Sequence, residues 1–325
     1  MTDRDRRAEA GARDGIETSR PIGRRRDDRL VGASAAMQRV IEGAAAAGRS
    51  EAPVLVAGPP GSGKKLVARA VHAWSVRASG LLVALACDAA SPLQAPELFG
   101  SAAATGRRVF EAESGALARA AGGSLLLAHA ERLDPALSER LAGALASGVF
   151  SREGELETQP LRARVLATAE DPREAALFDG CAPHVIVIPP LRERPEDVLP
   201  LAAHFLAAFA PPLEGALGFT EDARRLLLCE AWPGDVRELR ERVRQAVALS
   251  EPGPITAEAL LLAAEGDRPP LFKEAKRAFE VRYVSALLRH CGGNVSRAAR
   301  LAGKDRKDFY DVIRRNGLDL QRFRD

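Results

Sequence analysis

A glycine-rich loop at residues 58–64 restricts the fold of this chain more than any other feature. It reads Gly-Pro-Pro-Gly-Ser-Gly-Lys, with an apolar run (Ala52–Ala57) before it and a helical pattern (Lys65–Trp74) after it, which is the setting that a P-loop requires. Its glycines let backbone N–H groups face phosphate oxygens, and its lysine reaches the outer phosphates of a nucleotide. The predicted phosphate-binding residues of this segment are Gly58, Gly61, Ser62, Gly63, Lys64 and Lys65.

Lys65 departs from the usual P-loop. A Ser or Thr at this position normally offers its hydroxyl to Mg²⁺, and a second ammonium group repels the metal instead. We therefore expect ATP or ADP to bind and Mg²⁺-assisted chemistry to be impaired.

Short apolar runs alternate with helical patterns as far as residue 190, and the pattern is wholly helical after Pro189-Pro190. Buried strands that alternate with helices form a parallel, doubly wound α/β sheet, and the helices that follow predict a small lid. The expected strands are Ala52–Ala57, Leu81–Ala86, Ser124–Leu127, Arg164–Ala167 and Val185–Ile188, and the expected lid helices are Leu199–Phe209, Thr220–Glu230 and Val236–Leu249.

Composition divides the chain into five parts. Residues 1–29 have mixed charge and no period, which is typical of a disordered tail. The α/β subdomain takes residues 30–190 and the lid takes residues 191–250. Turn-rich residues 251–270 around one short helix read as a linker. An amphipathic helix (Leu271–His290) opens an all-helical module at residues 271–325.

The charge is distributed unevenly along the chain. Residues 271–325 hold 14 Lys and Arg against 7 Asp and Glu, a net charge of +7, and the remainder of the chain is at −4. A basic module on a slightly acidic body is the asymmetry expected where one end meets a polyanion, although a solvated basic face gives the same count.

Cysteine and hydropathy patterns exclude several classes of protein. No CxxC pair is present, which argues against a disulfide framework or a zinc site and fits a reducing cytosol. No apolar run has the length of a membrane span, and no signal peptide is evident. We expect a cytoplasmic protein without a metal, with both tryptophans (Trp74 and Trp232) in the core. The cysteines are Cys87, Cys181, Cys229 and Cys291.

Segments spread in order over residues 30–250 resemble the sigma-54-dependent enhancer-binding (NtrC-like) activators. The PPLRER and WPGxVREL blocks are specific to that family. The resemblance implies an AAA+ fold, and intact relatives hydrolyse ATP as a ring and engage sigma-54 through a GAFTGA loop. The segments are LVGASAAMQRV (30–40), PVLVAGPPGSGKKLVARAVHAWSVRA (53–78), ELFG (97–100), PPLRERPEDVLPLAAHF (189–205) and AWPGDVREL (231–239).

Two elements of the family's machinery read differently in this chain. The loop before Gly115 keeps its spacing, but residues 101–109 read SAAATGRRV, without the Phe-Thr pair that engages sigma-54. The family's LFLDE strand supplies an Asp for Mg²⁺ and a Glu that polarises the attacking water. Here Ala128 and His129 occupy those positions, and Ala86 replaces the Asn that pairs with the Glu.

The remaining catalytic positions are also altered. The sensor strand ends in Glu170 instead of Asn, and the positions of the trans-acting arginines fall on Glu174 and Gly180, with Arg173 one residue away. The second sensor, Arg237, is kept. Groups that bind nucleotide are thus present and groups that hydrolyse it are replaced, so the resemblance predicts a pseudo-ATPase.

Residues 271–325 resemble the Fis-type DNA-binding domain. Asn294 and Asp305 are expected to cap the two helices of a helix-turn-helix, with Gly303 in the turn. Asp308 and Asp311 would be repelled by phosphate, so they face a cytosine amino group, a neighbouring basic side chain or solvent. The predicted DNA-contacting residues are Asn294, Ser296, Arg297, Arg306, Lys307, Tyr310 and Arg314, and Arg315 is a further candidate for the same outward face.

These inferences lead to a sequence-specific regulator that binds double-stranded DNA and a nucleotide without efficient hydrolysis. The expected assembly is a homodimer or a larger ring, alone or mixed with an intact relative, with RNA polymerase as a further partner and a nucleoid location. Two alternatives stay open. One is an active sigma-54 activator that uses His129 as a base, and the other is a structural partner that neither binds nucleotide nor reads DNA.

Overall fold

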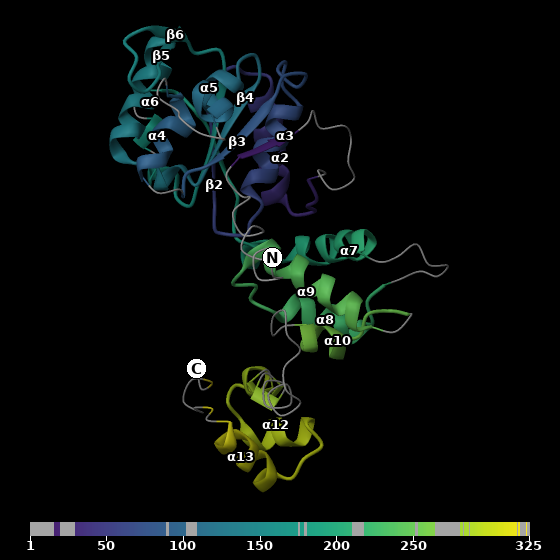
Figure 1. Cartoon of the computed structure of the whole chain (residues 1–325). Helices are drawn as coiled ribbons and strands as arrows, with labels where there is room; N and C mark the ends of the chain where they lie inside the picture. Colours follow the sequence, from purple (N-terminus) through teal and green to yellow (C-terminus); the bar gives the residue numbers. More distant parts are fainter. Residues whose placement is uncertain are drawn as a thin grey trace, which may run out of the picture. The chain divides into compact units, whose positions relative to one another are not determined.

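In the computed structural model of this protein, the described residues are 16–19, 30–88, 91–101, 109–174, 176–178, 181–209, 218–250, 253–263, 280–281, 283–285, 287–316, 318 and 323 (Figure 1). The chain divides into two compact units, Met1–Ala208 with Leu227–Glu241, and Phe209–Leu226 with Arg242–Asp325. Helix α9 (Asp235–Leu249) passes from the first unit into the second.

A sheet with the strand order β1-β3-β4-β7-β2-β8 forms the centre of the first unit. The neighbouring pairs from β3 to β8 are parallel, so the predicted α/β fold class is confirmed. Each expected strand is present within two residues of its predicted limits. The strands are β1 (Ile16–Ser19), β2 (Val54–Ala57), β3 (Leu82–Ala86), β4 (Ser124–Ala128), β7 (Arg164–Ala169) and β8 (His184–Val187).

Strand β1 differs from the unstructured tail that composition predicts for residues 1–29. Ile16–Ser19 pairs antiparallel with β3, with Ile16 opposite Leu85. The segment alternates β-branched Ile16 and Thr18 with polar residues, a pattern that suits a strand at a sheet edge. The rest of residues 1–29 lies outside the described part of the chain.

Helices cover both faces of the sheet because successive strand residues point to opposite faces and both sets are apolar. One core packs α2 (Ala35–Gly48) and α3 (Lys64–Ala73) against side chains of β2, β4 and β7. The opposite core packs α4 (Ser91–Phe99), α5 (Val109–Arg119) and α6 (Pro135–Ser147). Figure 1 shows the two helical layers on either side of the strands.

Trp74 and the segment at residues 149–160 depart from expectation in this unit, whereas Trp232 agrees with it. Trp232 is buried as predicted, and its Nε1 donates to the Leu227 carbonyl at 3.0 Å. Trp74 is 45% exposed, so its predicted place in the core is wrong; α3 ends at Ala73, one residue before it. A small hairpin of β5 (Val149–Ser151) and β6 (Thr158–Pro160) was not expected, because each strand has only three residues and the two are of mixed polarity.

The lid helices lie within one residue of their predicted limits. They are α7 (Val198–Phe209), α8 (Glu221–Cys229) and α9. Within the expected linker, residues 251–270, one short helix is present as α10 (Ala257–Leu262), which buries Leu260, and Ile255 N donates to the Gly218 carbonyl. Short 3₁₀ turns complete the chain as η3 (Ala130–Arg132), η4 (Pro172–Glu174), η5 (Ala176–Phe178), η6 (Leu191–Glu193) and η7 (Pro195–Asp197).

The C-terminal part of the second unit is helical. Residues 280–290 are in helix wherever they are described, followed by α12 (Val295–Leu301) and α13 (Arg306–Arg315). One apolar cluster joins the three, and Leu288 and Phe309 lie at its centre. Residues 271–279, where the predicted amphipathic helix begins, are outside the described residues. No helix in the described ranges is long and apolar enough to span a bilayer.

Candidate functional site

The glycine-rich loop connects β2 to α3, as the sequence predicts. Gly61 has φ 84° and Gly63 has φ 98°, conformations that side chains disfavour. A Cβ on Gly61 would lie 2.2 Å from the carbonyl oxygen of Gly234, so the loop and the turn before α9 touch through their backbones. No side chain caps the first turn of α3.

Lys64 lies over this loop. Its side chain is buried, and Nζ donates to the carbonyl oxygens of Gly58 at 2.6 Å and Pro59 at 3.1 Å. Burial lowers the pKa of the Lys64 ammonium, and nearby carboxylates oppose that shift. These carboxylates belong to Glu170, Glu131 and Asp235.

Two residues near Lys64 in the sequence, Ser62 and Lys65, face different surroundings. Ser62 is buried, and its hydroxyl has no hydrogen-bond partner within the described structure. Lys65 is exposed on the first turn of α3, where it presents a second positive charge. This side of the site therefore combines backbone donors, a free hydroxyl and two ammonium groups.

Strand β4 delivers Ala128 and His129 to the same edge of the sheet, since the carboxyl ends of parallel strands lie together. Ala128 is buried beside Ala86 of β3. His129 has φ 61°, and its backbone N donates to Thr168 Oγ1 at 3.1 Å. A methyl group thus occupies the end of β4.

Glu131 is a residue of this site that the sequence argument missed. Its Oε1 lies 3.3 Å from His129 Nδ1, and its buried Oε2 has no hydrogen-bond partner among the described residues. Its charge also acts on Lys64. The sequence does contain one signal for this residue, because Glu131 is an acidic residue that shortly follows an expected strand of the P-loop sheet.

The end of β7 contacts the P-loop directly. Gly58 N lies 3.2 Å from the carbonyl oxygens of both Ala169 and Glu170. The Glu170 side chain is exposed, and its charge raises the pKa of Lys64. The residue at the predicted sensor position therefore brings negative charge toward the phosphate loop.

Arg173 does not stand free at the predicted arginine-finger region. Its guanidinium binds Asp171, with Nη2 and Oδ2 2.8 Å apart, and these bonds lower the pKa of the Asp171 carboxyl. The pair is on the surface, where ion pairs contribute little to stability. The side chain of Glu174 and all of Gly180 lie outside the described residues.

Arg237 meets the P-loop through its backbone. Its N–H donates to the Gly61 carbonyl at 3.1 Å, and its side chain is exposed. The preceding turn is unusual, because Trp232 (φ 50°) and Asp235 (φ 57°) both have a positive φ without being glycine. Such a conformation persists only where the surroundings fix it.

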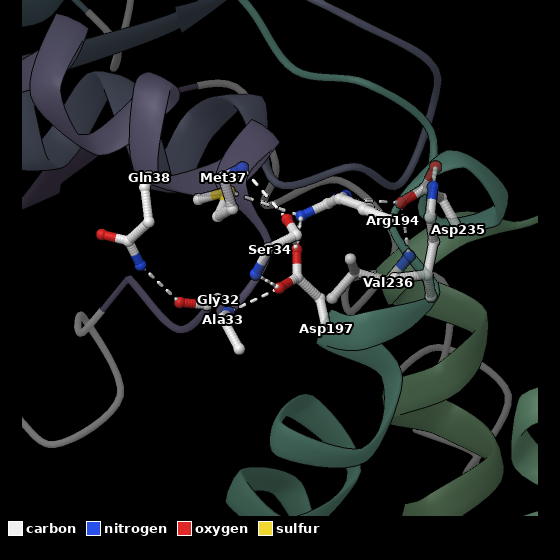
Figure 2. Close-up of polar contacts among 10 residues, drawn as sticks. Gly32, Ala33, Ser34, Met37, Gln38, Arg194, Asp197, Asp235 and Val236 are labelled. Atoms are coloured by element: carbon white, nitrogen blue, oxygen red, sulfur yellow. Dashed lines mark hydrogen bonds and ion pairs between the residues drawn. The ribbon is translucent and has the colours of Figure 1, made fainter.

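A buried ionic network supplies that constraint (Figure 2). Arg194 is 2% exposed, and its guanidinium nitrogens lie 3.6 Å from Asp197 Oδ2 and 3.5 Å from Asp235 Oδ1. Asp235 Oδ2 also accepts from Leu191 N at 3.0 Å. One cation thereby joins the turn after β8 to the first residue of α9.

Asp197 extends the network to the start of α2. Its Oδ1 accepts from Ala33 N at 2.5 Å and Ser34 N at 2.6 Å, and its Oδ2 accepts from Ser34 Oγ at 2.8 Å. Ser34 in turn caps α2 through Met37 N (Figure 2). These buried side chains therefore link three segments next to the P-loop, which are residues 32–34, 191–197 and 234–237.

The second unit contains the predicted helix-turn-helix. Asn294 caps α12 through the N–H of Arg297 at 3.1 Å, and Asp305 caps α13 through the N–H of Lys307 at 2.9 Å. Gly303 has φ 62° in the turn between them. Each of these local roles agrees with the prediction.

The predicted DNA-contacting side chains are exposed, apart from the partly buried Ser296. Arg306 lies over the Tyr310 ring, 5.8 Å from its centre. Arg315, a further candidate, is engaged by Glu280, with Nη2 and Oε2 2.5 Å apart. The basic side chains that lie together on α13 are Arg306, Lys307 and Arg314.

Two further predictions have no structural counterpart to describe. Residues 102–108, which hold most of the segment at the GAFTGA position, lie outside the described residues. Within the described ranges, no three His, Cys, Asp or Glu side chains are grouped as a metal site would require. Burial raises the pKa of the Cys87 thiol to about 12.

Comparison with known proteins places this geometry in a family. The sigma-54 interaction domain matches residues 30–180, and the AAA+ ATPase lid domain matches residues 192–275, a range that includes the expected linker. The transcriptional regulatory protein GlrR of Escherichia coli K12 is 32% identical over 96% of this chain and 73% of its own length. ZraR of Escherichia coli O157:H7 is 34% identical over 88% of the chain and 68% of its own length.

Solved structures agree with the sequence relatives. NtrX from Brucella abortus in complex with ATP superimposes with a TM-score of 0.62 at 27% identity, covering 90% of this chain and 71% of that one. Its complex with ADP gives the same TM-score at 26% identity, with 90% and 69% covered. The chain belongs to the NtrC-like family of sigma-54-dependent transcriptional regulators.

Proposed function

We propose that this chain is a DNA-binding transcription regulator whose AAA+ domain holds ATP or ADP but does not hydrolyse it efficiently. The observation that carries the proposal is the buried Ala128 at the end of β4, beside a fully formed P-loop. An alanine side chain holds no metal and orients no water, whereas the P-loop retains its backbone donors and Lys64.

Nucleotide binding is supported by the geometry around Lys64 and by the two NtrX complexes, one with ATP and one with ADP. The predicted contacts are the P-loop residues and Arg237. We expect binding without a strict need for Mg²⁺, because Lys65 and Ala128 occupy the positions where relatives of this family place metal-holding groups.

Three features argue against hydrolysis and sigma-54 remodelling. His129 replaces the water-polarising Glu, Glu170 adds negative charge near the phosphates, and residues 101–109 lack the Phe-Thr pair of the GAFTGA loop. Loss of the groups that use ATP leaves DNA binding and assembly, as a dimer or a ring, for regulation. The chain would then act without remodelling polymerase itself, or within rings that contain an intact relative.

DNA binding is supported by the helix-turn-helix and its basic outward face. Phosphate contacts from α12 and the start of α13 would position the module, and α13 side chains would read base edges. The candidate residues are Asn294, Ser296, Arg297, Arg306, Lys307, Tyr310 and Arg314.

A second function, an active ATPase, is favoured by one observation. His129 Nδ1 lies 3.3 Å from Glu131 Oε1, so a carboxylate orients an imidazole at the edge that carries the P-loop. A general base of this kind accepts a proton through its other ring nitrogen. This activity requires His129.

ATP turnover separates the two functions. The protein and its Lys64→Ala variant are assayed over a range of protein concentrations, with and without DNA, and His129→Ala is assayed beside them. Equal rates for all three proteins are expected. A concentration-dependent rate that is lost in both variants would establish the ATPase and refute the first proposal.

A further inference from the structure

The outward face of α13 has an acidic residue at its centre. Phe309 and Ile313 of this helix are buried in the core of the second unit. Successive helix residues are rotated by about 100°, so Asp311 points directly away from these two side chains. It lies four residues after Lys307 and three residues before Arg314, on one exposed stripe.

The Asp311 carboxylate is not engaged inside the protein. Asp305 caps α13, and Glu280 binds Arg315, so other carboxylates of this unit have local partners. Across the described residues, no hydrogen bond or ion pair involves Asp311. One acidic neighbour, Asp308, lies three residues before it, but Lys307, Arg314 and Arg306 give this face of α13 a net positive charge, so the helix can still approach a duplex.

A carboxylate accepts hydrogen bonds and donates none, which limits what it can contact on DNA. Phosphate oxygens and the guanine acceptors repel it. The donors of the major groove are the amino groups of cytosine and adenine. The adenine amino group has an acceptor on each side, its own N7 and O4 of the paired thymine, and these repel the second carboxylate oxygen. The cytosine N4 amino group has such an acceptor on one side only, O6 of the paired guanine, so it suits a carboxylate better.

We propose that Asp311 is a specificity-determining residue that accepts a hydrogen bond from the N4 amino group of a cytosine in the major groove. This inference rests on the proposed DNA-binding function. It assigns α13 a mixed reading surface, in which Lys307 and Arg314 hold the backbone or a guanine and Asp311 selects a cytosine.

Selection from random double-stranded DNA tests the assignment, with the full chain and two variants, Asp311→Asn and Asp308→Asn. Asp308 is a matched control because it is also an exposed aspartate of α13, one turn before Asp311, and it is rotated by about 60° from the direction opposite the core. We expect the wild type and Asp308→Asn to enrich one site with a fixed cytosine. In Asp311→Asn, preference for that cytosine should fall about tenfold, the discrimination of one good base contact.

Affinity for unrelated DNA provides a second readout. Both variants remove one negative charge, so both should bind unrelated DNA at least as tightly as the wild type. An unchanged base preference in Asp311→Asn would overturn the inference and leave DNA reading intact. Loss of all DNA binding by folded Asp311→Asn would overturn it too, because a lost negative charge does not weaken phosphate contacts. A wild type that enriches no sequence would instead refute the proposed DNA-reading function, and the inference with it.

Discussion

The P-loop and the ends of β4 and β7 lie at the same edge of the sheet, yet they carry different kinds of residue. The P-loop side has backbone donors, Lys64 and the contact to the turn before α9. The other side has a methyl group at Ala128 and a carboxylate at Glu170.

This difference follows from how each side is built. The P-loop contacts other segments through main-chain atoms, as Gly61 does with Gly234 and Arg237, so a change there disturbs the fold. The side chains at the strand ends project from a sheet whose hydrogen bonds do not depend on them. Under the proposed function, nucleotide binding and hydrolysis are therefore separable in this scaffold, because the side chains at the strand ends can be replaced while the P-loop keeps its contacts.

The largest effect should come from the network that supports the binding side. Arg194→Met leaves the Asp197 and Asp235 carboxylates buried without their cation, so we expect a loss of about 3–5 kcal/mol in the free energy of unfolding. Urea denaturation measures it. Arg192→Met, at a 65% exposed side chain nearby, is the control and should change stability by less than about 0.5 kcal/mol. Equal effects of the two variants would show that the binding side does not depend on the network.

A moderate effect should come from the ends of β4 and β7, where Glu170 follows β7. Glu170→Gln removes a charge that acts on Lys64, so ATP affinity should rise about fivefold, on the order of 1 kcal/mol. Titration with a fluorescent ATP analogue measures the change, with Glu157→Gln, at an exposed position before β6, as the control. Unchanged ATP affinity in Glu170→Gln would show that the charge at the end of β7 does not oppose nucleotide binding at the P-loop.

The smallest effect concerns His72. This residue connects α3, the helix after the P-loop, to β4, the strand that ends at Ala128. His72 Nδ1 lies 2.9 Å from Ser124 Oγ at the start of β4, and burial lowers the pKa of His72, with a smaller contribution from Arg164. Because the folded state disfavours the proton, the stabilisation is complete above the unfolded pKa of about 6.5 and is lost as the pH falls toward the folded value.

His72→Gln should therefore flatten the stability profile below about pH 6.5, where the wild-type slope due to this residue is at most about 1.4 kcal/mol per pH unit. Urea midpoints above and below this pH, compared between the two proteins, provide the measurement. Parallel profiles would show that the connection between α3 and β4 tolerates a charged imidazole.

Much of this structure was predictable because its signals are local. The buried strands are apolar runs, the caps Asn294 and Asp305 precede their helices, and the P-loop has a fixed spacing. β1 and the β5–β6 hairpin were missed because four or fewer residues of mixed polarity give no period. Glu131 was missed because its role depends on the turn after β4, which only the folded chain defines.

The hydrogen bonds of Lys64 have a consequence for the kinetics of nucleotide capture. Its ammonium is held by two carbonyl groups of its own loop, and the loop glycines already have their strained dihedral angles. Arrival of a phosphate is then an exchange of partners by one side chain within a preorganised loop. We expect rapid association, and we expect selectivity for ligands whose charge outcompetes two neutral carbonyls, which favours diphosphates and triphosphates over monophosphates.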